Sequence, residues 1–262
     1  ETRPKIGRLT HSDKQKKIPP LKIVGKTDVG MVRDTNQDAF KILALGQGAG
    51  LALVCDGMGG AQGGDTASYI AKKVIAETIQ EKYCDTMGSE AAKILVRESV
   101  LQANHAIYET ARDDPELAGM GTTVVLALLY QNHAYVAHVG DSRLYRYRNH
   151  QLVQLTRDHS YIQEMVDRGE LSPDQARVHP DRNFITRAVG VQWDVEIDLH
   201  VLELEPGDRL LLCTDGLSST CTDEQIGEVL SQNPLEESAE ILVRLANQGG
   251  GHDNITVVIV ES

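Results

Sequence analysis

Four aspartates, each beside a short apolar run, constrain the fold of this chain most. They are Asp56, Asp141, Asp215 and Asp253, and the first three are followed directly by glycine or serine. A carboxylate beside a buried strand costs free energy unless something offsets its desolvation, and hard divalent cations do so through oxygen ligands. We therefore expect the fold to bring these four distant segments together as one metal centre.

The composition is that of an ordinary globular protein with a strong negative charge. The chain has 262 residues and a formal net charge of −12, and this length is enough to bury a sizeable core. An acidic surface repels phosphate backbones, so we expect no nucleic-acid partner. No signal peptide is recognisable, and no apolar stretch approaches the roughly 18 residues that a membrane span requires. We expect a cytoplasmic monomer.

The ends of the chain and its thiols add two smaller expectations. Residues 1–22 carry seven Lys or Arg against two acids, which is typical of a basic flexible tail. Residues 23–262 would then form one domain.

The four cysteines are too irregularly spaced for a disulfide framework. Cys55 and Cys213 lie in apolar runs, where we expect small buried thiols in a reducing compartment.

Apolar patterning predicts strands and helices in separate groups. Strand-like runs are expected at 21–24, 39–45, 51–55, 122–130, 134–139, 143–148, 151–155, 195–204, 209–213 and 255–260. Helices are expected at 65–83, 90–112, 160–167, 223–231 and 235–247. Residues 168–187 are polar and irregular, as in an ordered loop or small subdomain. Grouped strands with paired helices between them do not fit alternating βαβ units, so we predict an α+β domain of two antiparallel sheets with helices outside.

Each motif taken alone has an ordinary structural explanation. Asp56-Gly57 is a common turn dipeptide, and the glycines after it are not a phosphate-binding P-loop because no Gly-Lys-Ser/Thr follows. The segment around Arg33 is either a hydrophilic turn or an arginine directed at an oxyanion. The aspartates at 141 and 215 fit strand-end turns. The three glycines before His252 permit close backbone packing just ahead of a strand.

Together, these motifs are far more specific. The segments 33–38, 56–60, 121–123, 140–143, 215–216 and 253–254 follow the order and rough spacing of the metal-dependent protein phosphatase (PPM) family. The resemblance is closest to bacterial type 2C serine/threonine phosphatases and runs from about Val24 to Glu261. It implies a four-layer αββα sandwich, in which two antiparallel β-sheets are flanked by helical pairs.

The resemblance also implies a metal centre of two Mn²⁺ or Mg²⁺ ions. By that match, Asp56 would bridge the two ions and the carbonyl of Gly57 would bind one of them. Asp215 and Asp253 would hold the other ion. Bacterial members often take a third ion, for which Asp141 together with Asp215 is the matching pair.

The reaction implied is hydrolysis of phosphoserine and phosphothreonine in proteins. A metal-bridging hydroxide would attack phosphorus directly, Asp38 would act on the metal-bound water, and Arg33 would grip the phosphate. Direct attack needs no protein nucleophile, so the cysteines are given no catalytic role. Some relatives carry a histidine as general acid where this chain has Met58. Metal-bound water is then the expected proton donor, with His159 and His252 as the alternatives.

Substrate and partners follow from the same resemblance. Residues 160–187 correspond to a flap beside the active site, which either helps to choose substrates or is an inert surface insertion. The expected partners are phosphorylated proteins, among them a bacterial serine/threonine kinase and its substrates. Two alternatives stay open. A pseudophosphatase would use the fold only for binding, and a phosphatase of a stress or sporulation switch would act on a single antagonist protein.

Overall fold

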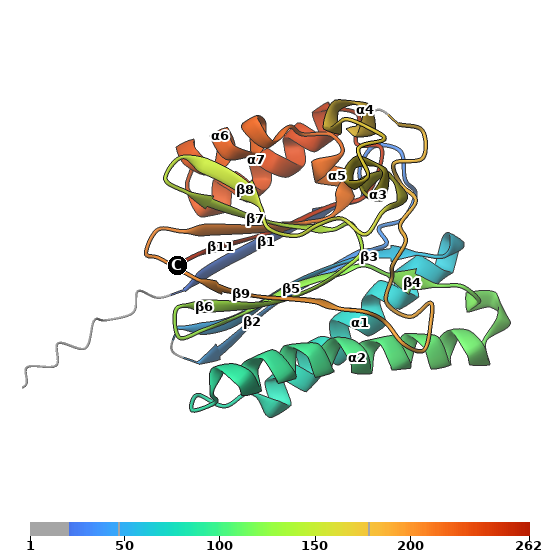
Figure 1. Ribbon diagram of the computed structural model, residues 1–262, viewed down its shortest axis with the longest axis horizontal. Coiled ribbons are helices and arrows are strands. Elements are labelled where there is room, and N and C mark those ends of the chain that lie inside the picture. Colours follow the sequence, from blue (N-terminus) through green and yellow to red (C-terminus); the bar gives the residue numbers. More distant parts are fainter. Residues whose placement is uncertain (1–20, 47, 178) are drawn as a thin grey trace, which may run out of the picture.

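Two β-sheets lie face to face with helices on the outer side of each, as Figure 1 shows. The computed structural model describes residues 21–46, 48–177 and 179–262. Most of the expected basic tail lies outside the described residues. The α+β architecture expected from the sequence, two antiparallel sheets flanked by helices, is confirmed.

The first sheet has five strands in the order β1-β11-β10-β7-β8, and every neighbouring pair is antiparallel. Its strands are β1 (Lys22–Asp28), β7 (Arg143–Arg148), β8 (Gln151–Gln154), β10 (Arg209–Cys213) and β11 (Ile255–Glu261). A two-residue turn joins β7 to β8. Asn149 and His150 have positive φ angles of 51° and 61° there, the conformation that matches the twist of a tight hairpin.

The second sheet has the order β2-β3-β5-β6-β9, and the short strand β4 pairs with β3. Its strands are β2 (Asp38–Gly46), β3 (Ala49–Met58), β4 (Gly121–Thr122), β5 (Val124–Tyr130), β6 (His133–Val139) and β9 (Asp198–Glu203). The turn expected between β5 and β6 is also a tight hairpin, with positive φ at Gln131 and Asn132. β9 is shorter than the run 195–204 that apolar content suggested.

A pair of long helices covers each sheet (Figure 1). α1 (Gly60–Lys82) and α2 (Ser89–Asp113) lie on the second sheet, and α6 (Asp223–Gln232) and α7 (Leu235–Gln248) lie on the first. Shorter helices are η1 (Pro115–Leu117), α3 (Tyr161–Asp167), α4 (Pro173–Arg177) and α5 (Asp215–Ser218). α1 begins five residues earlier than expected, because its glycine-rich first turn has no apolar periodicity to reveal it.

Strand β3 is buried on both faces, which explains its continuous apolar sequence. Leu51 and Leu53 pack under the helices, whereas Ala52 and Val54 pack between the sheets. The inter-sheet core also holds Leu144 of β7, which is fully buried. Burying a side chain of this size stabilises the fold by roughly 1.5–3 kcal/mol. The aspartates at the strand ends are therefore attached to the most tightly packed part of the molecule.

Truncation in the inter-sheet core tests this packing. Leu144→Ala removes a fully buried side chain and should lower the free energy of unfolding by about 2–5 kcal/mol, measured by urea denaturation. Val153→Ala on the edge strand β8 is the control, because Val153 is 44% exposed and its loss should cost well under half as much. Equal costs for the two variants would contradict this description of the core.

Candidate active site

A cavity of about 640 Å³ opens where several strands end. Six of the seven side chains or backbone groups predicted from the sequence line it, from five separate parts of the chain: Arg33, Asp56, Gly57, Asp141, Asp215 and Asp253. Asp38 lies directly beside this group, because its Cα pairs with that of Asp56 across β2 and β3. The structure therefore brings together all seven predicted positions.

Strand pairing explains why residues so distant in sequence meet here. Asp215 lies two residues after the end of β10, and Asp253 lies two residues before the start of β11. Because β10 and β11 are antiparallel, with Cys213 opposite Val257, the end of one strand lies beside the start of the other. Asp141 follows β6 by the same logic on the second sheet. The cavity is thus built from strand ends of both sheets.

Burial and repulsion between neighbours both disfavour the charged form of the carboxyl groups in this cluster. Burial raises the pKa of Asp38 to about 7 and that of Asp215 to about 6, and neighbouring carboxylates add to both shifts. Burial and the nearby aspartates also raise the pKa of Asp56 and of Asp141 far above the usual range. Such a group of acids favours any ligand that supplies positive charge.

The donor set fits divalent cations. The Oδ1 atoms of Asp38 and Asp215 are buried and have no hydrogen-bond partner among the described residues. Gly57 adds a backbone carbonyl, and a Cβ at this position would lie only 2.0 Å from the carbonyl oxygen of Gly64, so no larger residue fits there. Carboxylate and carbonyl oxygens are the ligands that Mg²⁺ and Mn²⁺ prefer. The residues present therefore suit such ions.

Neutral hydroxyl groups orient Asp38. Thr214 and Thr256 each donate a hydrogen bond from Oγ1 to Asp38 Oδ2, at 2.9 Å and 2.7 Å. The other carboxylate oxygen is left for a ligand. Neither threonine was predicted from the sequence to have a role. The available signal was a hydroxyl residue directly before Asp215 and another inside the apolar run of β11.

Thr123 holds the backbone of Asp56. Its Oγ1 accepts a hydrogen bond from the Asp56 N–H at 2.9 Å, and its own N–H donates to the Asp56 carbonyl at 2.8 Å. The Thr123 hydroxyl also lies 2.7 Å from that of Ser142. The aspartate at the end of β3 and the turn that carries Asp141 are therefore built on one shared side chain.

Asn254 positions the loop that carries Arg33. Its side-chain oxygen accepts the Gln37 N–H at 2.8 Å, and its amide nitrogen donates to the carbonyls of Val29 and Thr35, each at 2.9 Å. Arg33 itself is 50% exposed and donates from Nη2 to Asp253 Oδ2 at 2.8 Å. The arginine thus lies at the cavity rim, paired with one of the predicted metal ligands.

The histidines considered as general acids do not line the cavity. His252 is exposed. His159 is buried and bonded to Gly140 and Asp198. Met58, at the position where some relatives have a histidine, does line the cavity. The two cysteines in apolar runs are free and buried as expected, and burial raises the pKa of both thiols, which keeps them protonated at neutral pH and unsuited to attack phosphorus.

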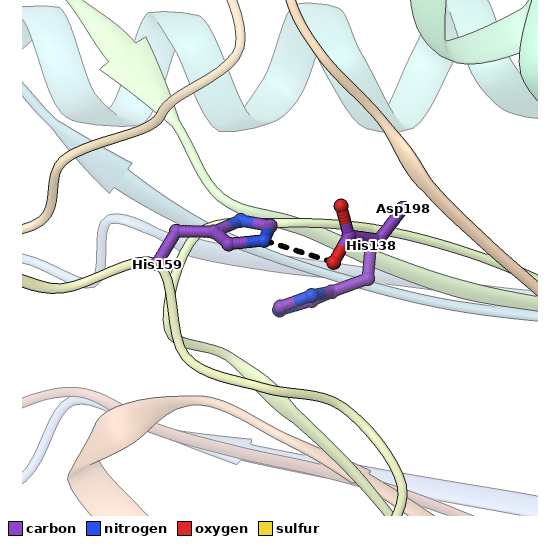
Figure 2. Close-up of side chains that lie close together, drawn as sticks. All are labelled: His138, His159 and Asp198. Carbon is purple, nitrogen blue, oxygen red and sulfur yellow. Dashed lines mark hydrogen bonds and ion pairs between the residues drawn. The ribbon is translucent and has the colours of Figure 1, made fainter. Parts of the chain in front are cut away.

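A second polar cluster, not predicted from the sequence, lies close to the cavity. His138, His159 and Asp198 present ligand atoms within 4.8 Å of one another (Figure 2), a candidate spacing for a metal ion. However, the Arg187 Nη1 atom lies 3.1 Å from His159 Nε2 and 2.9 Å from Asp198 Oδ1. A guanidinium in this position already supplies the positive charge and opposes a second cation. The charge balance therefore favours a hydrogen-bonded network of side chains over a metal site.

Comparison with known proteins decides the family. A model of the family described as protein phosphatase 2C matches residues 32–253. The chain belongs to the protein phosphatase 2C family. This phosphatase is 38% identical over 237 residues to the serine/threonine phosphatase stp of Listeria monocytogenes, which covers 90% of this chain and 94% of that protein.

Solved structures agree. The phosphatase resembles the crystal structure of the Mycobacterium tuberculosis serine/threonine phosphatase PstP/Ppp with a TM-score of 0.83 and 37% identity, covering 92% of this chain and 98% of that one. The catalytic domain of PstP has also been solved with two manganese ions, and it matches with a TM-score of 0.80 and 35% identity over 92% of this chain and 97% of that one. The protein is a bacterial-type serine/threonine protein phosphatase. None of the helices formed by the described residues combines the length and apolar composition of a transmembrane segment.

The raised carboxyl pKa values predict how cations stabilise this phosphatase. Asp38, with a pKa of about 7, binds its proton more tightly in the folded state than in the unfolded chain. The metal-free protein therefore loses this contribution to stability as pH rises from roughly 4 to 7. Because a cation replaces these protons, saturating Mn²⁺ should raise Tm more at about pH 7.5 than at about pH 5, as measured by calorimetry against EDTA.

The Asp56→Ala variant serves as the control for that measurement. It lacks the aspartate at the centre of the cluster, so its Mn²⁺-dependent rise in Tm should be largely lost at both pH values. A wild-type Mn²⁺ effect of the same size at both pH values would contradict the link between the carboxyl protons and the cations.

Proposed function

We propose that this phosphatase hydrolyses phosphoserine and phosphothreonine in proteins by direct attack of water on phosphorus, with no covalent phosphoenzyme. The main support is the convergence of buried carboxylates in one cavity that has an arginine at its rim. The buried thiols with raised pKa values offer no alternative nucleophile. Membership of the protein phosphatase 2C family supports the same reaction.

In this proposal, the aspartates hold the cations and orient them. Asp56 would be a ligand of both core ions, the Gly57 carbonyl would be a ligand of one of them, and Asp215 with Asp253 would hold the other. Asp141 and Asp215 would hold an accessory third ion. When bound, such ions acidify water at neutral pH and offset the charge that develops on the phosphoryl oxygens. Mn²⁺ is the ion reported in the PstP catalytic domain.

Arg33 and Asp38 complete the proposed chemistry. The planar guanidinium of Arg33 can hold two phosphate oxygens at once, and it needs only to leave Asp253 Oδ2 to do so. Asp38 is held through Oδ2 by two hydroxyl groups, so its Oδ1 is free to orient the attacking water and accept its proton. Asp38 thus keeps its two hydroxyl contacts while it acts on water, whereas Arg33 exchanges its contact with Asp253 for the phosphate.

The substrate is proposed to be a phosphoprotein segment that passes beneath residues 160–187, the flap of a single catalytic domain that spans residues 23–262. A second cavity of about 360 Å³ lies between this flap and α5, and it shares Asp141, Asn183 and Asp215 with the first. Polypeptide on one side of the phosphorylated residue would fit this space. A kinase of the same bacterium and its phosphorylated targets are the natural source of such segments.

Phosphate release tests the proposed reaction. We expect a phosphothreonine peptide to be hydrolysed with Mn²⁺ or Mg²⁺, and activity to vanish in excess EDTA and in Asp56→Ala. The physical reason is that the charge on phosphorus and on the attacking water cannot be balanced without the ions. A folded wild-type protein that binds Mn²⁺ but releases no phosphate under any cation would instead support the pseudophosphatase alternative.

Two asparagine variants separate the core ions from the accessory ion. Asp215→Asn should lower turnover on the order of 100-fold or more, because Asp215 is a proposed ligand of two ions. This loss is larger than the roughly 10–100-fold typical of residues that only hydrogen-bond to a metal ligand. Asp141→Asn should mainly change cation dependence and phosphoprotein turnover. Asp34→Asn, an exposed residue at the cavity rim, is the matched control and should stay close to wild type. Equal inactivity of the Asp141 and Asp215 variants on every substrate would show the division to be wrong.

A further inference from the structure

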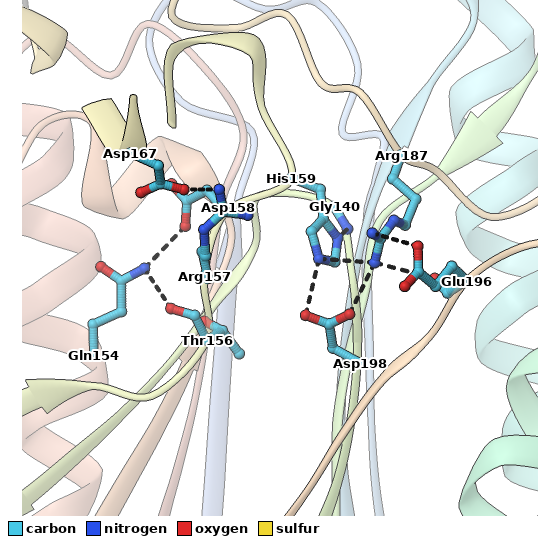
Figure 3. A network of polar contacts seen from close by, with 10 residues as sticks. All are labelled: Gly140, Gln154, Thr156, Arg157, Asp158, His159, Asp167, Arg187, Glu196 and Asp198. Carbon is cyan, nitrogen blue, oxygen red and sulfur yellow. Dashed lines mark hydrogen bonds and ion pairs between the residues drawn. The ribbon is translucent and has the colours of Figure 1, made fainter. Parts of the chain in front are cut away.

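One buried histidine holds the peptide that precedes Asp141. The Nδ1 atom of His159 accepts the Gly140 N–H at 3.0 Å, and the backbone N–H of His159 donates to the Gly140 carbonyl at 2.8 Å. Figure 3 shows the ring directly facing Gly140. His159 is 4% exposed, so water does not compete for these bonds. Both hydrogen-bonding groups of Gly140 are therefore satisfied by a single residue.

The same histidine also joins both ends of the flap. Its carbonyl accepts the Thr186 N–H at 2.8 Å, and the next residue, Ser160, pairs with Ile185 in an isolated antiparallel bridge. The Nε2 atom lies 3.1 Å from Asp198 Oδ2, and Arg187 donates to the other oxygen of that carboxylate at 2.9 Å. The flap therefore begins and ends at one hydrogen-bonded network that includes Gly140.

These contacts determine where the proton lies on the ring. The Gly140 N–H can donate only to a nitrogen that carries no proton, so Nδ1 is unprotonated. The proton is then on Nε2, where it is donated to Asp198. The short distance from Nε2 to Arg187 joins two donors and is not a hydrogen bond. Burial also lowers the pKa of His159, which agrees with a neutral ring.

The position of Gly140 in turn controls Asp141. Gly140 has a φ of 108°, and a Cβ there would lie 2.6 Å from Thr123 Cγ2. The peptide is therefore packed tightly against the residue that also orients Asp56. Because Asp141 is the next residue in the chain, a shift of the Gly140 peptide would move the backbone that carries the Asp141 carboxylate.

We infer that His159 is a positioning residue: as the neutral tautomer with its proton on Nε2, it holds the Gly140 peptide and so places Asp141 for the accessory cation. This inference rests on the proposed function, in which Asp141 is a ligand of that cation. His159 does not itself line the cavity.

Two variants of His159 separate its nitrogen atoms. The side-chain oxygen of asparagine stands one bond from Cγ, as Nδ1 does, so His159→Asn keeps an acceptor for Gly140 and loses the donor to Asp198. Glutamine reaches the Nε2 position instead, so His159→Gln keeps a donor and loses the acceptor. His138→Gln is the matched control. His138 is a buried histidine whose ring lies 4.7 Å from that of His159, and its ring nitrogens bond to no described residue.

Mn²⁺ binding is measured by electron paramagnetic resonance, and Asp141→Asn identifies the weak class of sites. We expect His159→Gln to weaken that class about tenfold and to leave the strong class unchanged. His159→Asn and His138→Gln should both bind within about threefold of wild type, a difference of about 0.65 kcal/mol, which is small beside the tenfold effect. A purely structural role for the buried ring would weaken both His159 variants alike.

Three results would overturn the inference. A normal weak class in a folded His159→Gln protein would overturn it alone and leave the proposed function intact. A wild-type chain with no weak class that depends on Asp141 would overturn the proposed third cation and this inference with it. Loss of a Mn²⁺ site in His138→Gln would show that the two imidazoles are themselves ligands.

A spectroscopic readout on the wild-type protein keeps the inference testable if a variant fails to fold. Long-range ¹⁵N–¹H correlation spectra of the histidine rings distinguish a protonated from an unprotonated nitrogen. At neutral pH, His159 should show an unprotonated Nδ1 and a protonated Nε2, both with and without Mn²⁺. A proton on Nδ1 would overturn the assignment, because that nitrogen could not then accept the Gly140 N–H.

Discussion

Mutual repulsion among buried carboxylates at one end of the sandwich is the constraint on which the rest of the structure depends. Asp38 and Asp56 lie on paired strands and Asp215 begins α5 directly beyond β10, all attached to the buried core, so they cannot move apart to relieve it. Burial is the larger cause of their raised pKa values, and repulsion from the neighbouring carboxylates adds to it. A cluster of this kind is stable only when protons or cations share the charge, so metal binding and folding are coupled through the same side chains.

The side chains that hold the acidic cluster in place are mostly neutral, and their neutrality preserves its affinity for cations. Threonine hydroxyls orient Asp38 and Asp56 without contributing charge. A lysine or a second arginine in their place would neutralise the acids and remove the attraction for divalent ions. Arg33 is the exception, and it lies at the rim where it is half exposed. The core of the site is thus reserved for cations, and the arginine is placed where a phosphate would enter.

A second network extends this logic towards the flap. The relay from Arg187 through Asp198 to His159 reaches Gly140, one residue from Asp141. Its charges are compensated internally, in contrast to the acidic cluster. Its apparent suitability for a metal ion follows from the spacing of the side chains, but the guanidinium beside it already supplies the positive charge. An acidic cluster that needs cations and a network that already contains its own cation therefore lie close together in the fold.

The sequence by itself determined the two-layer sheet architecture, the paired helices and the set of aspartates, because strand and helix periodicity and Asp-Gly turns are local patterns. The order of the motifs also indicated the family, and every site position was predicted from that match. Only the tertiary structure decided which residues support that site. The bond from Thr214 to Asp38 spans 176 positions, and those from Asn254 to the Arg33 loop span more than 200. Likewise, His159 looks like any surface histidine until the fold places Gly140 against its ring. Such contacts depend on how the strands meet, and no local pattern records them.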